Sequence, residues 1–257
     1  MTFFNLKDRE SIVVCGDIHG EFSSLVHKVI SSNRISHATV IVAGDCGFGF
    51  YRFNYYDDLY KLKLHGKLLD ADVQIFMMRG NHDDPEYFNK RLIDYPFFKT
   101  IPDYSVLQTA SHNILCVGGA ISIDRVPRIS KMQLDKILGK KTLPLYWENE
   151  PILFSEKELD FLSSHNIKID TVITHSAPSF CPPFQKGWVE NFATKDESLL
   201  SDIRKERENT ERLYTWLANH NHPLRNWFYG HFHDSAIWQQ DQTTFTMLNI
   251  MELKNLL

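Results

Sequence analysis

Short apolar runs that end in glycine and a polar side chain limit the fold of this chain more than any other feature. The first run, SIVVCGDIHG at residues 11–20, places Asp17 and His19 among glycines after four apolar residues. The run at 114–123 is long enough to extend toward a further strand. Continuous apolar runs of this kind are typical of strands covered on both faces. They lie at residues 12–16, 38–45, 73–81, 114–123, 171–176, 227–233 and 244–250.

Helical patterns separate these runs. They lie at residues 22–33 and at 55–70, where Leu59, Leu62 and Leu69 are near helical spacing. Strands that alternate with helices predict a layered α/β domain.

The chain has no internal repeat, low-complexity tract or obvious linker, so we expect a single domain over residues 1–257. Two segments break the alternation of strands and helices. Residues 124–166 are rich in lysine, proline and aromatic side chains, and residues 181–225 contain a charged stretch that predicts an exposed helix. We expect both segments to be insertions that overhang one end of the sheet, where long insertions often carry function.

Composition excludes several classes of protein. The net charge of −4 does not favour electrostatic capture of nucleic acid. No apolar run approaches the roughly 18 residues of a membrane helix, and the start of the chain is too short and too charged for a signal peptide. The four cysteines form no CxxC pair, which indicates reduced core thiols. We therefore expect a cytoplasmic protein that does not bind membranes.

Aspartate, asparagine and histidine follow five of the apolar runs. In open α/β sheets, ligands bind at the carboxyl edge of the strands. Two pairs, Asp17 with His19 and His231 with His233, are two residues apart, a spacing that directs both side chains of a pair to one side of an extended segment. The residues that we expect to meet at this edge are Asp17, His19, Asp45, Asn81, His82, Asp83, His175, His231 and His233.

The chemistry of this set predicts metal ions. Imidazole suits Zn, Fe or Mn, whereas carboxylate and amide oxygens suit harder ions. The set contains no cysteine, which argues against a closed structural zinc site. Among these nine residues, seven candidate ligands are too many for one tetrahedral ion, but two ions that share a carboxylate, about 3.5–4 Å apart, would use them all.

The motifs GDIHG, GD, GNHD, THS and GHFH follow one another in this order between residues 15 and 233. Together they resemble the calcineurin-like metallophosphoesterase superfamily. The motif GGAISIDR resembles its bacterial and phage members, and the Ser/Thr protein phosphatases are more distant. The resemblance implies a four-layer α-β-β-α sandwich of two mixed β-sheets flanked by helices, with the metal site at the carboxyl edge of the strands.

The resemblance also assigns roles to the residues of the motifs. It implies two divalent or trivalent ions, Mn, Fe or Zn. The first ion is assigned to Asp17, His19 and His233. The second is assigned to Asn81, His175 and His231. Asp45 would bridge the two ions, and His82 would be a catalytic histidine that binds neither.

The implied reaction is direct attack of a metal-activated hydroxide on a phosphate ester, without a covalent intermediate. His82 would protonate the leaving oxygen or stabilise its charge. Asp83 is a candidate partner for a histidine, although the sequence does not say which one.

The second motif departs from the protein-phosphatase branch, in which it resembles GDxVDRG. This chain has GDCGFGF, so Phe48 and Gly49 stand in place of an aspartate and a phosphate-clamping arginine. Arg125 in GGAISIDR is a candidate clamp from another loop, and Arg79 is a second. We favour a phosphomonoesterase acting on a protein or a small molecule. The alternatives are a nucleotide phosphodiesterase and a binding scaffold that has lost its chemistry.

Some residues resemble the candidate site residues in type or spacing but do not follow an apolar run. His220 and His222 are two residues apart, but they follow a charged helix and are expected at its C-terminus. Tyr146 and Trp147 are candidates for stacking on a substrate ring, and packing of residues 124–166 onto the body is the favoured alternative.

Overall fold

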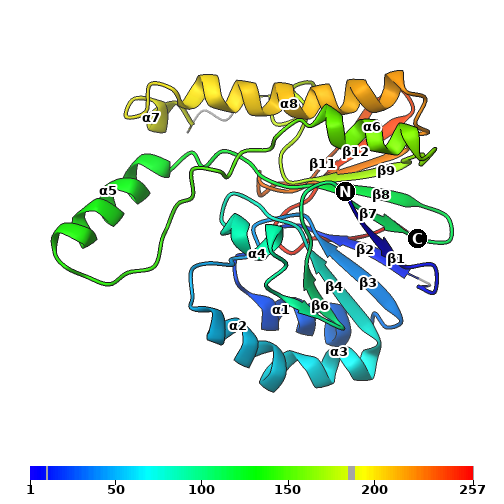
Figure 1. The fold of residues 1–257 in the computed structure, drawn as a ribbon, viewed down its shortest axis with the longest axis horizontal. Coiled ribbons are helices and arrows are strands. Elements are labelled where there is room, and N and C mark those ends of the chain that lie inside the picture. Colours follow the sequence, from blue (N-terminus) through cyan, green and yellow to red (C-terminus); the bar gives the residue numbers. More distant parts are fainter. Residues whose placement is uncertain (10, 185–188, 257) are drawn as a thin grey trace.

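The computed structural model describes residues 1–9, 11–184 and 189–256. Two mixed β-sheets lie face to face in it (Figure 1). The strands of the first sheet, in order, are β13 (Leu253–Asn255), β2 (Ser11–Cys15), β3 (Ala38–Val42), β4 (Val73–Met77), β6 (Phe98–Thr100) and β5 (Asp94–Tyr95). Strands β2, β3, β4 and β6 are parallel, and the two edge strands are antiparallel to their neighbours.

The second sheet has seven strands. In order they are β1 (Thr2–Asn5), β7 (Ser105–Gln108), β8 (Asn113–Val117), β9 (Thr171–Thr174), β10 (Asn226–Tyr229), β12 (Thr243–Met247) and β11 (Ala236–Gln240). Strands β8, β9, β10 and β12 are parallel, whereas β7 and β11 run antiparallel to β8 and β12. Both sheets are therefore mixed.

Three apolar cores separate four layers. Along β2, Ile12 and Val14 pack into the core between the sheets, and Val13 and Cys15 pack toward the helices on the other face. This alternation follows from the two-residue period of a strand, and it explains why the whole run is apolar. Figure 1 shows α1 and α3 on the outer face of the first sheet and α6 and α8 on that of the second. The predicted α-β-β-α sandwich is confirmed.

The helices of the first sheet are less regular than the sequence pattern suggests. They are α1 (Phe22–Val26), α2 (Phe53–Leu59), α3 (His65–Ala71) and α4 (Pro85–Asn89), with π-helical segments at His27–Ser32 and Tyr60–Leu64. Of the three leucines that indicated the second helix only Leu59 is buried, and Leu62 and Leu69 are exposed. The π-helical segment changes the period, so that Tyr60 and Leu64 face the core instead.

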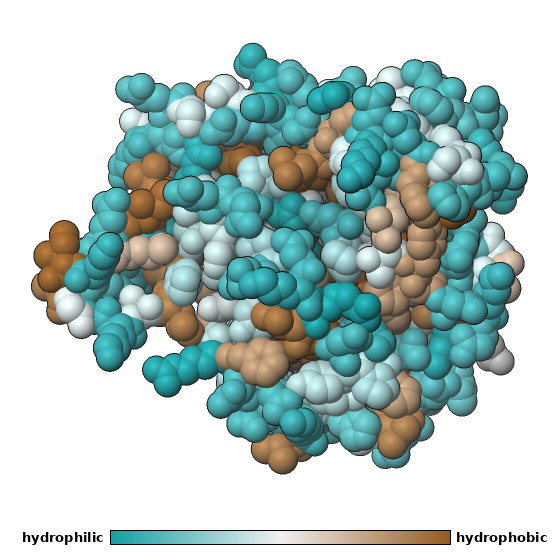
Figure 2. All heavy atoms as spheres, in the orientation of Figure 1, coloured by the Kyte–Doolittle hydropathy of each residue, from teal (hydrophilic) through white to brown (hydrophobic). Residues whose placement is uncertain are grey.

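The two predicted insertions contain the remaining helices. They are α5 (Arg125–Ile137), α6 (Glu156–Ser164), α7 (Val189–Ala193) and α8 (Leu199–Asn219). Helix α8, expected to be exposed, buries one face that includes Leu213, Trp216 and Leu217 against the second sheet. Helix α5 projects to one side of the molecule, where Figure 2 shows a hydrophobic end.

The apolar run at 114–123 contains one strand only. Residues 118–123, all described by the structure, form no strand after β8 ends at Val117. Gly119 has a φ of +99°, a value that favours glycine, and the chain turns there toward α5. All four cysteines are buried free thiols, as predicted. Among the described residues, no helix is long and apolar enough to cross a membrane.

Candidate metal centre

The predicted ligands follow five strands that end at one edge of the sandwich. These strands are β2, β3 and β4 of the first sheet and β9 and β10 of the second. Each predicted ligand lies at most four residues after the end of its strand. The candidate ligands therefore come from both sheets, and neither sheet alone provides the full set.

Six of the predicted ligands form two groups, and within each group the ligand atoms lie within 4.8 Å of one another. One group consists of Asp17, His19, Asp45 and His233. The other consists of Asp45, His175 and His231. Asp45 belongs to both groups, as expected of a carboxylate that bridges two ions.

In the first group, three ligand atoms converge. Nε2 of His19 lies 3.0 Å from Nε2 of His233, which lies 3.1 Å from Oδ2 of Asp17. Asp17 is fully buried, and its carboxylate also accepts a hydrogen bond from the backbone N–H of His231. That hydrogen bond fixes the carboxylate, so its other lone pairs can serve a cation.

In the second group, His175 has a defined tautomer when it is neutral. Its Nδ1 lies 2.7 Å from the carbonyl oxygen of Ala43, which only accepts hydrogen bonds, so Nδ1 carries the proton. Nε2 then presents a lone pair, and it lies 3.1 Å from both Oδ1 of Asp45 and Oδ1 of Asn81. When His175 is neutral, these three acceptors face one another, an arrangement that favours a cation between them. This donor set therefore fits a metal ion.

The electrostatics of the centre also favour positive charge. Burial by itself lowers the pKa of His175, but Asp45, Asp17 and the hydrogen bonds outweigh it and raise that pKa to about 10. Burial likewise opposes ionisation of Asp45, yet the neighbouring histidines hold its pKa well below its usual range. Without an ion, a proton on His175 balances the carboxylates. A metal cation would replace that proton.

The backbone of the centre is held in an uncommon conformation. His19, Asp45, His231 and His233 have φ values of +46°, +47°, +68° and +51°, in the left-handed region. For residues other than glycine this costs on the order of 1–3 kcal/mol each, and such strain persists where the surroundings impose it. Here the backbone N–H of His19 donates to the carbonyl of Asp45, and that of His231 donates to Asp17.

The glycines of the motifs allow the strand ends to approach one another. A Cβ atom on Gly80 would lie 2.1 Å from Oδ1 of Asp45 and 2.7 Å from Nε2 of His175. A Cβ atom on Gly230 would lie 2.2 Å from Oδ1 of Asp17. Both positions require glycine because a ligand atom occupies the space of the side chain.

His82 lies beside the two groups. Its backbone N–H donates to Oδ1 of Asp45 at 2.8 Å, and its ring centre is 5.3 Å from that of His19. Burial is the main cause that lowers the pKa of His82, and the charge of Arg128 adds to it, although Asp45 opposes both. His82 therefore lies next to both groups of candidate ligands and belongs to neither.

Arg128, which we did not select from the sequence, contacts the candidate catalytic residue His82. Its Nη2 atom lies 2.9 Å from Nε2 and 3.3 Å from Nδ1 of His82. A nitrogen at those distances in the ring plane would collide with ring carbons, so the guanidinium lies over the face of the imidazole. Its Nε donates to Asp124 and its Nη1 to the carbonyl of Leu145. The available signal was a second arginine, three residues after Arg125 in the same predicted segment.

The two arginines that we selected have other partners. Arg125 binds Asp196 and Asp202 through its guanidinium, and it joins α5 to the segment around the start of α8. Arg79 is 3% exposed, and it binds Asp103 and the backbone carbonyls of residues 149–151. These partners hold both guanidinium groups, and the expectation that either arginine binds phosphate stays a prediction.

Asp83 also differs from expectation. We expected it to contact a histidine, but its buried carboxylate accepts four backbone hydrogen bonds, from Cys46, Gly47, Phe48 and Gly80. Burial and the nearby Asp45 raise the pKa of Asp83 to about 7, and the backbone N–H groups oppose that rise. Asp83 therefore holds the loop of residues 46–48, which follows Asp45, by accepting hydrogen bonds from its backbone.

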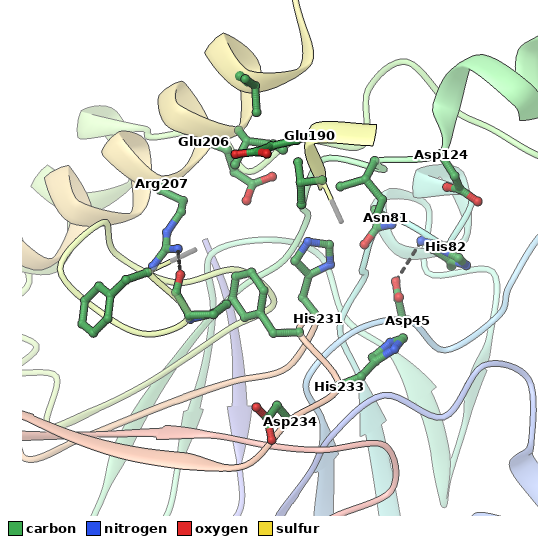
Figure 3. A pocket seen from close by; sticks show the side chains of 17 residues that line it. Asp45, Asn81, His82, Asp124, Glu190, Glu206, Arg207, His231, His233 and Asp234 are labelled. Carbon is green, nitrogen blue, oxygen red and sulfur yellow. Dashed lines mark hydrogen bonds between the residues drawn. The ribbon is translucent and has the colours of Figure 1, made fainter. Parts of the chain in front are cut away.

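A cavity of 610 Å³ lies over the centre. Asp45, Asn81, His82, His231 and His233 line one side of it (Figure 3). Both predicted insertions contribute to its walls. The wall residues are Ile123, Asp124, Pro183, Phe184, Val189, Glu190, Leu200, Ile203, Glu206 and Arg207, with Phe232 and Asp234 after the last motif. In Figure 3, Glu206 and Arg207 face the cavity from α8, across from His82.

The remaining sequence candidates lie where packing requires them. Trp147 lies 5.4 Å from Phe50, ring centre to ring centre, and its ring covers Gly49. This supports the packing alternative for that residue. His220 is the C-terminal cap of α8, as predicted, and its ring stacks on Trp216.

The chain is similar to one known protein family and to several solved structures. A family model described as calcineurin-like phosphoesterase matches residues 10–235. No curated protein matches the chain. Among solved structures, a dimetal phosphatase from Danio rerio has a TM-score of 0.45 and 15% identity, over 93% of this chain and 87% of its own. A phosphopantetheinyl hydrolase from Mycobacterium tuberculosis has a TM-score of 0.45 and 14% identity, over 95% and 91%.

The family model extends over most of the chain and includes every predicted ligand. The structure brings six of those ligands together in two groups that share Asp45. The chain belongs to the calcineurin-like phosphoesterase family and is a metal-dependent phosphoesterase.

Proposed function

We propose that this chain hydrolyses phosphomonoesters at the centre shared by its two sheets. The observation that carries the proposal is the position of Arg128 over the ring of His82. A phosphomonoester dianion carries one more negative charge than a diester, and charge-assisted hydrogen bonds from arginine hold such oxygens well. In this proposal Arg128 takes the place of the arginine that GDCGFGF lacks, a role that we also considered for Arg125.

The residues of the chain divide the work as follows. Asp17, His19 and His233 would hold one ion, Asn81, His175 and His231 the other, and Asp45 both. When bound, the two ions supply Lewis acidity that neutralises phosphoryl charge and acidifies water. The mixed nitrogen and oxygen donors suit Mn, Fe or Zn.

His82 would act on the leaving group. Its side chain lines the cavity, and Nη2 of Arg128 lies 2.9 Å from its Nε2. A protonated His82 donates a hydrogen bond to the leaving oxygen and transfers its proton as that oxygen departs. The charge of Arg128 lowers the pKa of His82, which makes the imidazolium a stronger acid.

The test compares a chromogenic phosphate monoester with the matching diester, with Mn²⁺-loaded protein. We expect the monoester to be turned over faster. Arg128→Ala should lower kcat/KM for the monoester by roughly 10- to 100-fold, the cost of one hydrogen bond between charged groups, and should affect the diester less. Arg91→Ala, which removes a partly exposed arginine from an ion pair with Asp94, is the matched control.

Two outcomes contradict the proposal. Faster turnover of the diester would identify a phosphodiesterase, and the search would move to nucleotides. No turnover of either ester by protein with two bound ions would favour a binding scaffold.

A further inference from the structure

We propose that Ser122 and Glu150 are positioning residues that orient the side-chain amide of Asn81 toward the metal centre. The inference rests on the metal centre and not on the choice of a monoester as substrate. It concerns a chain of buried hydrogen bonds that begins outside all five motifs.

The three side chains are connected end to end. Nδ2 of Asn81 lies 3.0 Å from Oγ of Ser122, and that hydroxyl donates to Oε2 of Glu150 at 2.6 Å. The other oxygen of Glu150 accepts the backbone N–H of Ser122 at 2.7 Å. The exposed fractions of Asn81, Ser122 and Glu150 are 3%, 1% and 0%, so water does not compete for these contacts.

The direction of each hydrogen bond follows from which of the groups carry hydrogens that they can donate. Burial raises the pKa of Glu150 to about 8. In its ionised form the carboxylate of Glu150 only accepts, so the single hydroxyl hydrogen of Ser122 goes to Glu150. The serine oxygen then turns a lone pair toward Asn81, and only the NH₂ end of the amide can face it. Oδ1 of Asn81 is thereby directed to the other side, where it lies 3.1 Å from Nε2 of His175. In the reverse orientation, the NH₂ group of Asn81 would face the cation, and an NH₂ group has no lone pair with which to bind a metal ion.

Two buried glutamates hold the loop that carries Ser122. Glu150 accepts the backbone N–H of Ser122, and Glu206 of α8 accepts that of Ile121. Glu206 also accepts the hydroxyl of Ser176, the residue after His175. Glu150 lies in the first predicted insertion and Glu206 in the second. Both insertions therefore fix the loop that orients a ligand, in addition to their part in the cavity walls.

The test is binding of Mn²⁺ to metal-stripped protein, measured by calorimetry and by equilibrium dialysis with metal analysis. Ser122→Ala leaves the NH₂ of Asn81 without its partner, so both orientations of the amide become accessible. We expect one of the two Mn²⁺ sites to weaken by roughly 10- to 100-fold, the usual effect of removing a hydrogen-bond partner of a ligand. The other site should keep its affinity, because Asn81 belongs to only one.

A second variant addresses the other end of the chain. Glu150→Gln removes the obligate acceptor, so the hydroxyl of Ser122 becomes free to donate to Asn81 and to favour the reverse orientation. We expect the same Mn²⁺ site to weaken. Ser122 and Glu150 both act through the orientation of Asn81. The double variant should therefore lower the Mn²⁺ affinity of that site by less than the product of the two single fold-changes.

Ser105→Ala is the matched control, because it also removes a buried hydroxyl with a hydrogen bond, to the carbonyl of Pro102, away from the centre. Thermal unfolding of the metal-free proteins shows how much stability each change costs. Unchanged affinity at both sites in Ser122→Ala would overturn the proposal. Equal weakening of both sites, matched by Ser105→Ala, would reduce Ser122 to a structural role. Since the readout is metal affinity, the wrong choice of ester would not affect it.

Discussion

Oδ1 of Asp45 lies 3.1 Å from Nε2 of His175, although Asp45 follows a strand of the first sheet and His175 a strand of the second. The same oxygen accepts the backbone N–H of His82. One carboxylate therefore joins both sheets and both groups of metal ligands. Its place at the junction makes the centre a product of the sandwich and not of either sheet.

Asp45→Asn should weaken both metal sites together. An amide has a single oxygen, so it cannot serve two ions, and its NH₂ would face either a cation or the N–H of His82. We expect a loss of affinity greater than the roughly 10- to 100-fold caused by an outer partner. Metal analysis after gel filtration measures it. Loss of one ion with normal retention of the other would show that Asp45 does not bridge.

His82→Ala should keep both ions and lose most turnover. The ring of His82 lies beside the two groups of ligands, and general acid catalysis contributes about 10²- to 10⁴-fold. We expect kcat to fall by a factor in that range while the metal content stays that of the unmodified protein. Normal kcat in this variant would exclude His82 from the reaction.

Gly80→Ala should disrupt the centre by steric conflict. The new Cβ would lie 2.1 Å from Oδ1 and 2.2 Å from the backbone nitrogen of Asp45, so one strand end must move. Overpacking of this kind costs about 1–3 kcal/mol, and metal binding should fall with stability. The contrasting change is Gly66→Ala, because no atom lies within 4 Å of its Cβ position in α3. It should raise the free energy of unfolding by about 0.5–1 kcal/mol. Equal stability of the two variants would refute this explanation.

His222 should make the protein less stable in mild acid. Its Nδ1 accepts the backbone N–H of Ile169 at 2.9 Å, and burial, with Lys168 and His220, lowers the pKa of His222 to about 4. The unfolded chain, with a usual histidine pKa near 6.5, binds this proton more readily. The free energy of unfolding should therefore fall as the pH drops from about 6.5 to 4.

The control for this prediction is His222→Asn, whose side-chain oxygen can take the place of Nδ1 without titrating. Urea unfolding at several values of pH should give a smaller decrease in stability for this variant. An identical decrease in both proteins would show that other groups cause it.

The positions of the candidate ligands could be predicted from the sequence because each motif is local. An apolar run specifies a buried strand, and the residues just after it must emerge at the edge of the sheet. This reasoning placed Asp17, Asp45, Asn81 and His175 correctly. It also explained the glycines, since close approach of strand ends leaves no room for a side chain.

The partners of the charged side chains depended on contacts between distant segments. Arg125 and Arg128 lie one helical turn apart in the same motif region, and only the fold shows that Asp196 and Asp202 bind the first. Arg128 is therefore the arginine that contacts the ring of His82.

Ser122 and Glu150 were likewise invisible in the sequence, because a hydrogen bond is decided by distances of tenths of an ångström. Apolar patterning specifies which face of a strand is buried and where the strand ends. It does not specify which of several nearby arginines or acids arrives within 3 Å of a given atom. Local sequence therefore determined the edge at which chemistry occurs, and packing of the two insertions against that edge decided which side chains support it.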